Sequence, residues 1–322
     1  MKSNSLLSMR VLVKRYIKLY LKDKITVFFS ILAPVIVLLL YILFLGDMQV
    51  ASIKGMLEDF GIVEGTVTTA EIRMLINNWM IAGVMSVSCI TVALNANNIM
   101  VRDRVTGNIN DVLAAPVKRW VVYLSYIISC FIITFCICFL VLIMSIVYLA
   151  ATQGLMMSFM DFLAIFGITI LSIMSSAFFT TMICSFIKTQ SALSAINGVV
   201  AAAVGFLIGA YLPFSMLPQG VQYLACFIPG TYSAGLYRNY FMRGIVDYLK
   251  TKELPPNVME TLLKDYSIDL EFFGTKISAG WMTFALLISI VVFGILLWVF
   301  YSNKKTNFFT FGRRKLKKVK KH

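Results

Sequence analysis

The chain has 322 residues and is strongly apolar, since 59% of its residues are hydrophobic and only 14% are charged. A water-soluble domain carries roughly a quarter charged residues, so this chain cannot cover a water-facing surface of its size. Its mean hydropathy is +0.85, and its charges are grouped between long apolar runs. The composition therefore excludes a soluble globular domain and predicts an integral membrane protein.

The first 25 residues predict an amphipathic helix that lies on the membrane surface and leads into the first span. Four basic residues recur at intervals of four, which places them on one helical face: Arg10, Lys14, Lys18 and Lys22. Apolar residues such as Leu12 and Tyr16 can enter the headgroup boundary. No small-residue cleavage site follows the first apolar run, so we expect it to stay in the membrane as an anchor.

A hydrocarbon core about 30 Å thick needs roughly 20 apolar residues as helix. Six stretches have this length, and we predict an all-α fold with six transmembrane helices. They cover residues 26–45, 79–100, 120–150, 162–187, 192–212 and 281–301. The second stretch ends in a cluster of Asn95, Asn97 and Asn98, which either lines an entrance or is the polar edge of the helix. A stripe of small polar residues on the fourth predicts hydrogen bonds between helices: Thr169, Ser172, Ser176 and Thr180.

Residues 213–232 form a further apolar segment that carries Pro213, Pro218 and Pro229. Three prolines within 20 residues are incompatible with one straight helix. Non-helical backbone at membrane depth survives only where protein or water satisfies it. We therefore predict a re-entrant pair of short helices before the last span. Residues 46–78 and 233–280 are expected to be external loops, and the sequence suggests no function for them.

The basic residues fall on one side of the predicted bundle. If the N-terminus is cytoplasmic, the cytoplasmic segments are 1–25, 101–119, the turn at Lys188, and 302–322. They hold 21 of the 29 basic residues and 3 of the 15 acidic ones. The positive-inside rule then places both termini in the cytoplasm of a multi-pass cell-membrane protein. This arrangement argues against nucleic-acid binding, and the basic tail 302–322 either meets anionic lipid headgroups or is solvated.

The sequence offers no catalytic, metal-binding or cofactor-binding residues. All charged residues fall in predicted loops or at span edges, whereas ion-coupled transporters usually keep an ionisable residue within the membrane. The only histidine is His322, and five of the six cysteines lie in apolar runs, where cysteine behaves as a small hydrophobe. The phosphate-binding pattern GxxxxGK[ST] is absent. Energy for any transport would therefore have to come from a separate protein.

Residues 101–119 are the only internal cytoplasmic loop of any length. The loop begins with Arg102, Asp103 and Arg104 and turns through Gly107 and Asn108. Ile109, Val112 and Leu113 then follow at helical spacing, and Ala115-Pro116 closes the segment. This pattern predicts a short amphipathic helix that presents polar groups, including Asp111, to the cytoplasm. The alternative is a plain solvated connector.

These features together resemble the type-2 ATP-binding cassette (ABC) exporter permeases, which include drug, polysaccharide and lipid exporters. The resemblance covers nearly the whole chain. It rests on the N-terminal amphipathic helix, on the loop RDRVTGNINDVLAAPVKRW, and on FIPGTYSAGLYRNYF before the last span. The family loop has a charged start, a Gly-Thr pair and a small-residue-Pro close. Here Asn108 stands where Thr is commoner, and Asn110-Asp111 is more polar than the usual Leu-Glu.

The resemblance implies that the loop seats in a groove of a separately encoded ABC ATPase, which would bind ATP and Mg. The residues implied in this coupling are Arg102, Asp103, Arg104, Gly107, Asn108, Asp111, Ala115 and Pro116. It also implies a dimer with a second copy or a homologous permease, and a substrate path lined mainly by the second and fifth spans. The re-entrant segment would cap the external exit through Pro213, Phe214, Pro218, Pro229 and Tyr232.

Gly205 and Gly209 form a GxxxG pattern in the fifth span, which is either a dimer contact or a chance match. We predict the permease subunit of an ATP-driven exporter that moves an apolar or amphipathic substrate. A drug, an antibiotic peptide or a lipid-linked molecule would suit a path without buried charge. Two alternatives stay open at this point: a passive channel or secondary carrier, and a non-transporting membrane scaffold or immunity protein.

Overall fold

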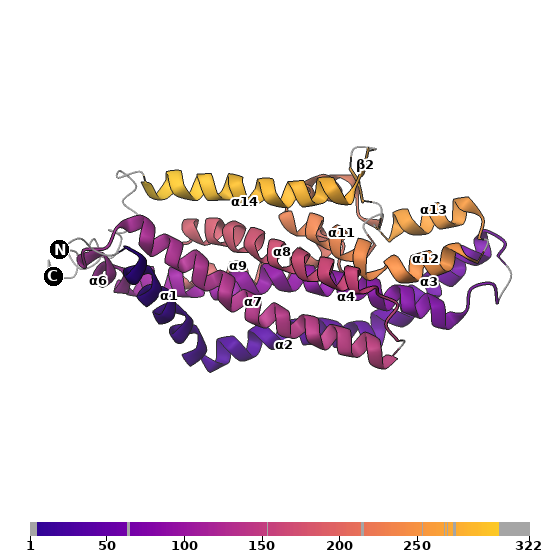
Figure 1. The fold of residues 1–322 in the computed structure, drawn as a ribbon, viewed down its shortest axis with the longest axis horizontal. Coiled ribbons are helices and arrows are strands. Elements are labelled where there is room, and N and C mark those ends of the chain that lie inside the picture. Colours follow the sequence, from indigo (N-terminus) through magenta and orange to yellow (C-terminus); the bar gives the residue numbers. More distant parts are fainter. Residues whose placement is uncertain are drawn as a thin grey trace.

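The computed structural model describes residues 5–62, 65–152, 154–213, 216–252, 254–266, 268, 270–272 and 275–302. This part of the chain is an elongated helical bundle (Figure 1), in which six helices are long and apolar enough to cross a membrane. The predicted all-α fold with six candidate spans is thereby confirmed. Helices α1 (Ser5–Lys22) and α6 (Asn108–Ala114) lie at one end, hereafter the α6 end. Helices α3 (Gly46–Asp59), α12 (Arg243–Lys250) and α13 (Pro256–Asp265) lie at the opposite, α13 end.

Helix α1 is amphipathic, but its apolar face packs against the protein. The sequence predicts Leu12 and Tyr16 at the headgroup boundary, whereas the structure buries them in a core cluster with Val122. Its buried residues are Leu12, Tyr16 and Tyr20, whereas the four basic residues at intervals of four are exposed. Asp23 separates α1 from α2 (Lys24–Leu40) and caps the new helix by accepting a hydrogen bond of 3.2 Å from the Thr26 amide. The chain therefore turns sharply between the two helices (Figure 1).

The first span does not end where its apolar run ends. Helix α2 continues through a π-helical turn, Tyr41–Leu45, directly into α3, which ends at Asp59. The predicted external loop 46–78 is thus helical over its first 14 residues. The physical reason is that Val50, Ile53 and Leu57 form a buried face of α3, which packs against α4 (Thr69–Ala96) and so stabilises helix beyond the apolar run.

Helix α4 is the centre of the bundle, because 21 of its 28 residues are buried. It contacts α2, α3, α7 (Arg119–Thr152), α8 (Phe159–Phe186), α9 (Gln190–Leu207) and α11 (Pro229–Phe241). A capping box of Thr68 and Glu71 begins the helix. Polar side chains also hold neighbours to it: the Asn97 amide donates to Thr180 Oγ1 (2.9 Å), and Thr181 Oγ1 donates to Asn97 Oδ1 (3.2 Å).

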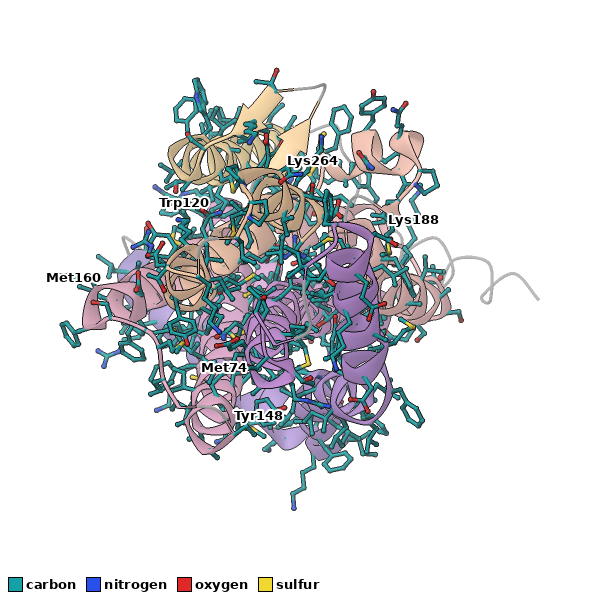
Figure 2. The ribbon with its side chains drawn as sticks, turned by 90° about the vertical axis from the view of Figure 1, so that its right-hand side faces the viewer. Met74, Trp120, Tyr148, Met160, Lys188 and Lys264 are labelled. Carbon is teal, nitrogen blue, oxygen red and sulfur yellow. The ribbon has the colours of Figure 1, made fainter. Side chains whose placement is uncertain are left out.

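The remaining spans surround this centre. Helix α14 (Ala279–Ser302) lies along one outer edge of the bundle (Figure 1), and only three of its 24 residues are buried: Met282, Leu286 and Leu297. Figure 2, which views the molecule from the α13 end, shows Met160 of α8 at the rim, pointing away from the other helices. The apolar side chains on these outer faces are those expected to contact lipid.

Within the described residues, the predicted re-entrant segment contains α10 (Gln219–Ala225) and the beginning of α11. Helix α11 extends to Phe241, beyond the predicted end at residue 232, and contacts α4, α8 and α14. Its small residues permit this close approach. A Cβ atom at Gly230 would lie 2.3 Å from Ile90 Cδ1, and one at Gly235 would lie 2.7 Å from Met282 Sδ. A segment expected to be an external loop therefore includes a helix in the interior.

This placement corrects the expectation that every charged residue lies in a loop or at a span edge. Arg238 of α11 has no exposed surface. Its Nη2 atom donates a hydrogen bond to the carbonyl oxygen of Gly209, and its guanidinium carbon lies 5.5 Å from the centre of the Trp79 ring. The burial of Arg238 could not be predicted from the sequence. The surrounding residues are a mixture of glycine, serine, tyrosine and apolar residues, and they do not form an apolar run.

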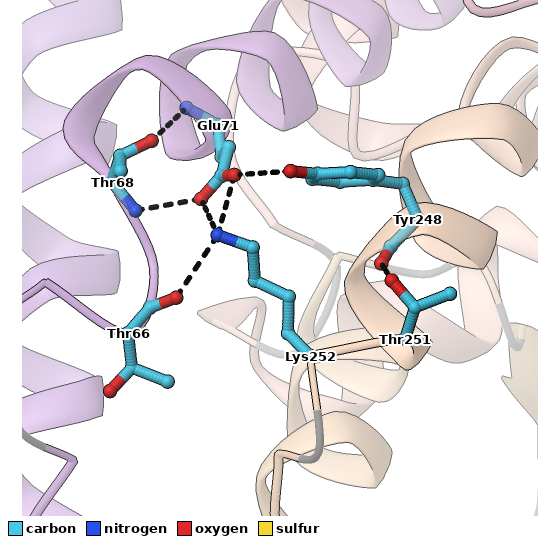
Figure 3. A network of polar contacts seen from close by, with 6 residues as sticks. All are labelled: Thr66, Thr68, Glu71, Tyr248, Thr251 and Lys252. Carbon is cyan, nitrogen blue, oxygen red and sulfur yellow. Dashed lines mark hydrogen bonds and ion pairs between the residues drawn. The ribbon is translucent and has the colours of Figure 1, made fainter.

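The α13 end is held together by an ion-pair network (Figure 3). Glu71 accepts hydrogen bonds from the Thr68 amide (2.7 Å), from Tyr248 Oη (3.0 Å) and from Lys252 Nζ (2.8 Å). The network joins the first turn of α4 to α12. Two short antiparallel strands, β1 (Leu270–Phe272) and β2 (Thr275–Ile277), then lead the chain into α14. Helices α3, α12 and α13 thus form a folded cap over the bundle.

Candidate functional site

The loop between α4 and α7 consists of two short helices that meet at one glycine. Helix α5 (Asn98–Thr106) ends at Gly107, and α6 begins after it. Gly107 has φ = +84°, in the left-handed region, which side chains with a Cβ rarely adopt. The nearest atom to a Cβ placed there would be Asn110 Nδ2 at 3.6 Å. Glycine is therefore favoured at this position by the backbone conformation, and not by a lack of room for a side chain.

One face of α6 is buried and the other is free. Ile109 is 1% exposed and belongs to a core cluster with Tyr16, Met100 and Val122. Exposed residues of α6 and of the turn that follows it form what we call the coupling surface: Asn108, Asn110, Asp111, Ala115 and Pro116. Within the described residues this segment is therefore a helix with one buried face, whereas a plain solvated connector would have none.

Asp103 points inward, to the junction of three helices. Its side chain is 4% exposed. Tyr126 Oη of α7 donates a hydrogen bond of 2.8 Å to Asp103 Oδ2, and Arg15 Nη1 of α1 lies 3.5 Å from the same oxygen. Tyr16 stacks on Tyr126, with 4.1 Å between ring centres. Burial raises the pKa of Tyr16 to about 12, so its phenol is neutral at physiological pH. The carboxylate therefore fixes α5 to both α1 and α7.

Arg104 also points inward and terminates α8. Its Nη1 atom donates to the carbonyl oxygens of Cys184 (3.2 Å), Ser185 (3.3 Å) and Ile187 (3.0 Å). These carbonyl groups lie at the C-terminal end of α8, where no further helical turn can satisfy them. Arg102 differs, since its side chain is 66% exposed and pairs with Asp23 at 3.8 Å. The predicted coupling residues therefore separate into inward anchors and outward contacts.

A polar cavity of about 870 Å³ opens beside this loop, between α1, α2 and α5. Its lining includes Arg15, Asn95, Asn98, Arg102 and Gln190. A small second cavity of about 80 Å³ lies between α2, α4 and α9, and Asn95 lines both. The asparagine cluster thus divides: Asn97 packs between helices, whereas Asn95 and Asn98 face the polar cavity.

The residues that line these two cavities follow one face of α4. Ser88, Thr91 and Asn95 line the small cavity, and Asn98 continues the row at the start of α5. We call this row the polar stripe. Ser88 and Thr91 are not among the residues predicted from the sequence. Successive members of the row from Ser88 to Asn98 are nevertheless three, four and three residues apart, which is the spacing of a single helical face. Asn197 of α9 closes the row by donating to Asn98 Oδ1 at 3.2 Å.

The predicted gate residues lie at the other end of the polar stripe. Pro218 precedes α10, and Pro229 occupies the first turn of α11, where its missing N–H costs no hydrogen bond. Tyr232 Oη donates to the Cys226 carbonyl at 2.9 Å, and Ser86 Oγ of α4 donates to the Gly230 carbonyl at 2.7 Å. Pro213 is buried, and Phe214 lies outside the described residues. The turn between α10 and α11 is thus anchored directly on α4.

The two glycines of the GxxxG pattern have roles within the chain. A Cβ atom at Gly205 would lie 2.1 Å from Tyr211 Cε2, so the Tyr211 ring occupies the space that a second helix would need. Gly209 has φ = +69° and accepts the hydrogen bond from Arg238. The exposed face of α9 lies elsewhere and carries small residues, among them Ser194, Gly198 and Ala202.

Comparison with known proteins adds one finding to this geometry. The sequence model of the family described as ABC-2 type transporter matches residues 8–242, which include most of α1, the α5–α6 loop, the polar stripe and α11. The comparison with curated proteins gives no match.

Proposed function

The chain belongs to the ABC-2 type transporter family and is therefore the permease subunit of an ABC transporter, and from this premise we propose that it exports apolar or amphipathic molecules. The observation that best supports ATP-driven export is the exposed coupling surface. It is carried by α6, whose other face is packed against the transmembrane bundle.

The coupling surface is suited to docking in a groove of a separate ATPase. It presents the Asp111 carboxylate, the side-chain amides of Asn108 and Asn110, and the rigid dipeptide Ala115-Pro116. Movement of α6 would pass inward by three routes: Ile109 in the core, Asp103 to α1 and α7, and Arg104 to α8. ATP and Mg would be bound by the partner, and this chain would contribute no catalytic group.

The polar stripe is the part of the chain best suited to contact a substrate. Its side chains are uncharged, and Ser88 and Thr91 already donate their hydroxyl hydrogens to the carbonyl oxygens of Val84 (2.6 Å) and Val87 (3.0 Å). Such a face offers weak polar contacts and no counter-ion, which favours an amphipathic drug, an antibiotic peptide or a lipid-linked molecule over an ion. Transport would run outward from the α6 end, which the positive-inside rule places in the cytoplasm.

The buried Arg238 does not support the alternative of an ion-coupled secondary carrier. Arginine keeps its proton at physiological pH, and Arg238 donates to a backbone carbonyl, which cannot accept a proton in exchange. No carboxylate within the described residues forms an ion pair with it. Energy for transport is therefore still expected from outside the chain.

The experiment is a mild-detergent purification of the tagged chain from its native membrane, followed by an ATPase assay on the eluate. We expect an ATPase to co-purify, and ATP to drive uptake of an amphipathic dye into inverted membrane vesicles. Asp111→Arg reverses the only charge of the coupling surface. If the ATPase groove meets Asp111 with a basic side chain, the co-purified activity should fall about tenfold or more, because like charges at an interface cost several kcal/mol. Asp247→Arg is the matched control, since Asp247 is 61% exposed on α12 at the opposite end.

Two results would contradict the proposal at different levels. A homo-oligomer without ATPase activity would favour the passive channel or the scaffold. Co-purified ATPase activity that Asp111→Arg leaves unchanged would retain the permease and reject the coupling surface.

A further inference from the structure

A groove of about 710 Å³ lies on the outer side of the bundle, between α7, α8 and α14, and is distinct from both cavities at the polar stripe. Its volume falls within the range of small-molecule sites. Leu124, Ile127, Phe178 and Leu297 contribute apolar walls, and the stacked rings of Tyr123 and Tyr301, 3.3 Å apart at their centres, also line it. It extends along α14 from Gly294 to Ser302, a rise of about 12 Å.

The chemistry changes along this groove. Its apolar part begins at Gly294, within the span. Arg119, Trp120 and Trp298 also line the groove, together with Ser302, the last residue of α14. Trp120 is 48% exposed and Trp298 is 67% exposed. Exposed tryptophans beside an arginine are typical of the membrane–water interface. None of the described residues that line the groove is acidic.

We propose that this groove binds an anionic phospholipid of the leaflet at the α6 end. One acyl chain would lie along Phe178 and Leu297, and the phosphate would meet the guanidinium of Arg119. Charge complementarity identifies this occupant, because Lys118 is exposed next to Arg119 and residues 303–322, which follow Ser302 directly, carry nine further basic residues and no acidic one. The inference does not depend on the proposed export function.

Gly294 provides a way to close the groove without disturbing the core. A Cβ atom there would lie 3.5 Å from Phe178 Cε1, an ordinary contact, so Gly294→Ala should fold normally and leave the groove open. Gly294→Leu would place three more carbon atoms in the groove and exclude an acyl chain. Arg119→Gln removes the charge, and Arg119→Lys retains it.

The four tryptophans allow binding to be read by fluorescence quenching. Trp79 is fully buried, and Trp281 lies at the far end of α14. In a Trp281→Phe background the exposed tryptophans are therefore the two that line the groove. The full-length chain would be reconstituted in phosphatidylcholine bilayers containing brominated-chain phosphatidylglycerol or, separately, brominated-chain phosphatidylcholine at equal mole fractions.

We expect an apparent preference for phosphatidylglycerol of about fivefold, the contribution of roughly one basic side chain near the membrane surface. The preference should persist in Gly294→Ala and Arg119→Lys and disappear in Gly294→Leu and Arg119→Gln. Equal quenching by the two lipids, or a preference that survives Arg119→Gln, would overturn the proposal. An equal preference at Trp281, measured in a Trp120→Phe, Trp298→Phe background, would also overturn it, because general attraction to a basic protein would then be the cause.

Discussion

The guanidinium of Arg238 donates a hydrogen bond from Nη2 to the carbonyl oxygen of Gly209, and this contact joins the interior helix α11 to the turn that ends α9. The Trp79 ring covers the guanidinium from the side of α4. One charged side chain therefore links three helices at the level where the exit of the path is expected.

Replacement of Arg238 should destabilise the protein without preventing its insertion. Arg238→Met keeps most of the side-chain volume but leaves the Gly209 carbonyl without its partner, and we expect a loss of about 2 kcal/mol. The apparent melting temperature in detergent should fall by about 4–8 °C. Arg73→Met is the control, because Arg73 is 53% exposed and its pair with Asp47 is a surface ion pair, typically worth less than about 1 kcal/mol. Equal melting temperatures for the two variants would contradict this role.

The effect of replacing Gly107 should depend on how well the new residue adopts a positive φ, and not on the size of its side chain. Gly107→Ala forces a Cβ into the left-handed region, at a cost of about 1–2 kcal/mol, and should disturb the angle between α5 and α6. We expect ATPase coupling to fall while expression stays normal. Gly107→Asn should retain more coupling than Gly107→Ala, because asparagine tolerates this conformation better. Gly167→Ala is the control, since nothing lies within 4 Å of a Cβ there. An alanine variant as active as the asparagine variant would contradict the argument.

The contact between Tyr126 and Asp103 should have a measurable coupling free energy. Tyr126→Phe leaves a buried carboxylate without its phenol donor, and we expect the free energy of unfolding to fall by about 1–3 kcal/mol. In the Asp103→Ala background the same change should cost much less. A double-mutant cycle read by thermal unfolding measures the difference. Strictly additive effects would show that the hydrogen bond contributes nothing to stability.

If the permease is a dimer, its copies should meet at the exposed small-residue face of α9. Gly198→Cys and Ala202→Cys, each in a Cys136→Ala background, should form disulfide-linked dimers in membranes under mild oxidation. Cys136 is removed because it is the exposed one of the six cysteines. Gly167→Cys, at an exposed position of α8, should stay monomeric on a non-reducing gel. Cross-linking through Gly167→Cys alone would place the dimer contact on another face.

The sequence alone determines the class of this protein and much of its layout. Apolar runs of sufficient length predict six spans, because each span must satisfy its backbone hydrogen bonds internally. The periodicity of Ile109, Val112 and Leu113 predicts α6, and the glycine before it marks the turn. These features are local, so they can be read without knowing what the helices touch.

Only the tertiary structure decides which polar groups are anchors and which are free. Asp103 and Asp111 are both acids in one loop, yet Asp103 is buried against Tyr126 whereas Asp111 is exposed. Asn97 and Asn98 are adjacent, yet one packs between helices and the other lines a cavity. Arg238 lies in a segment of mixed composition and is nevertheless buried. In each case the environment is set by helices that are distant in the chain, and their approach depends on packing that no local pattern encodes.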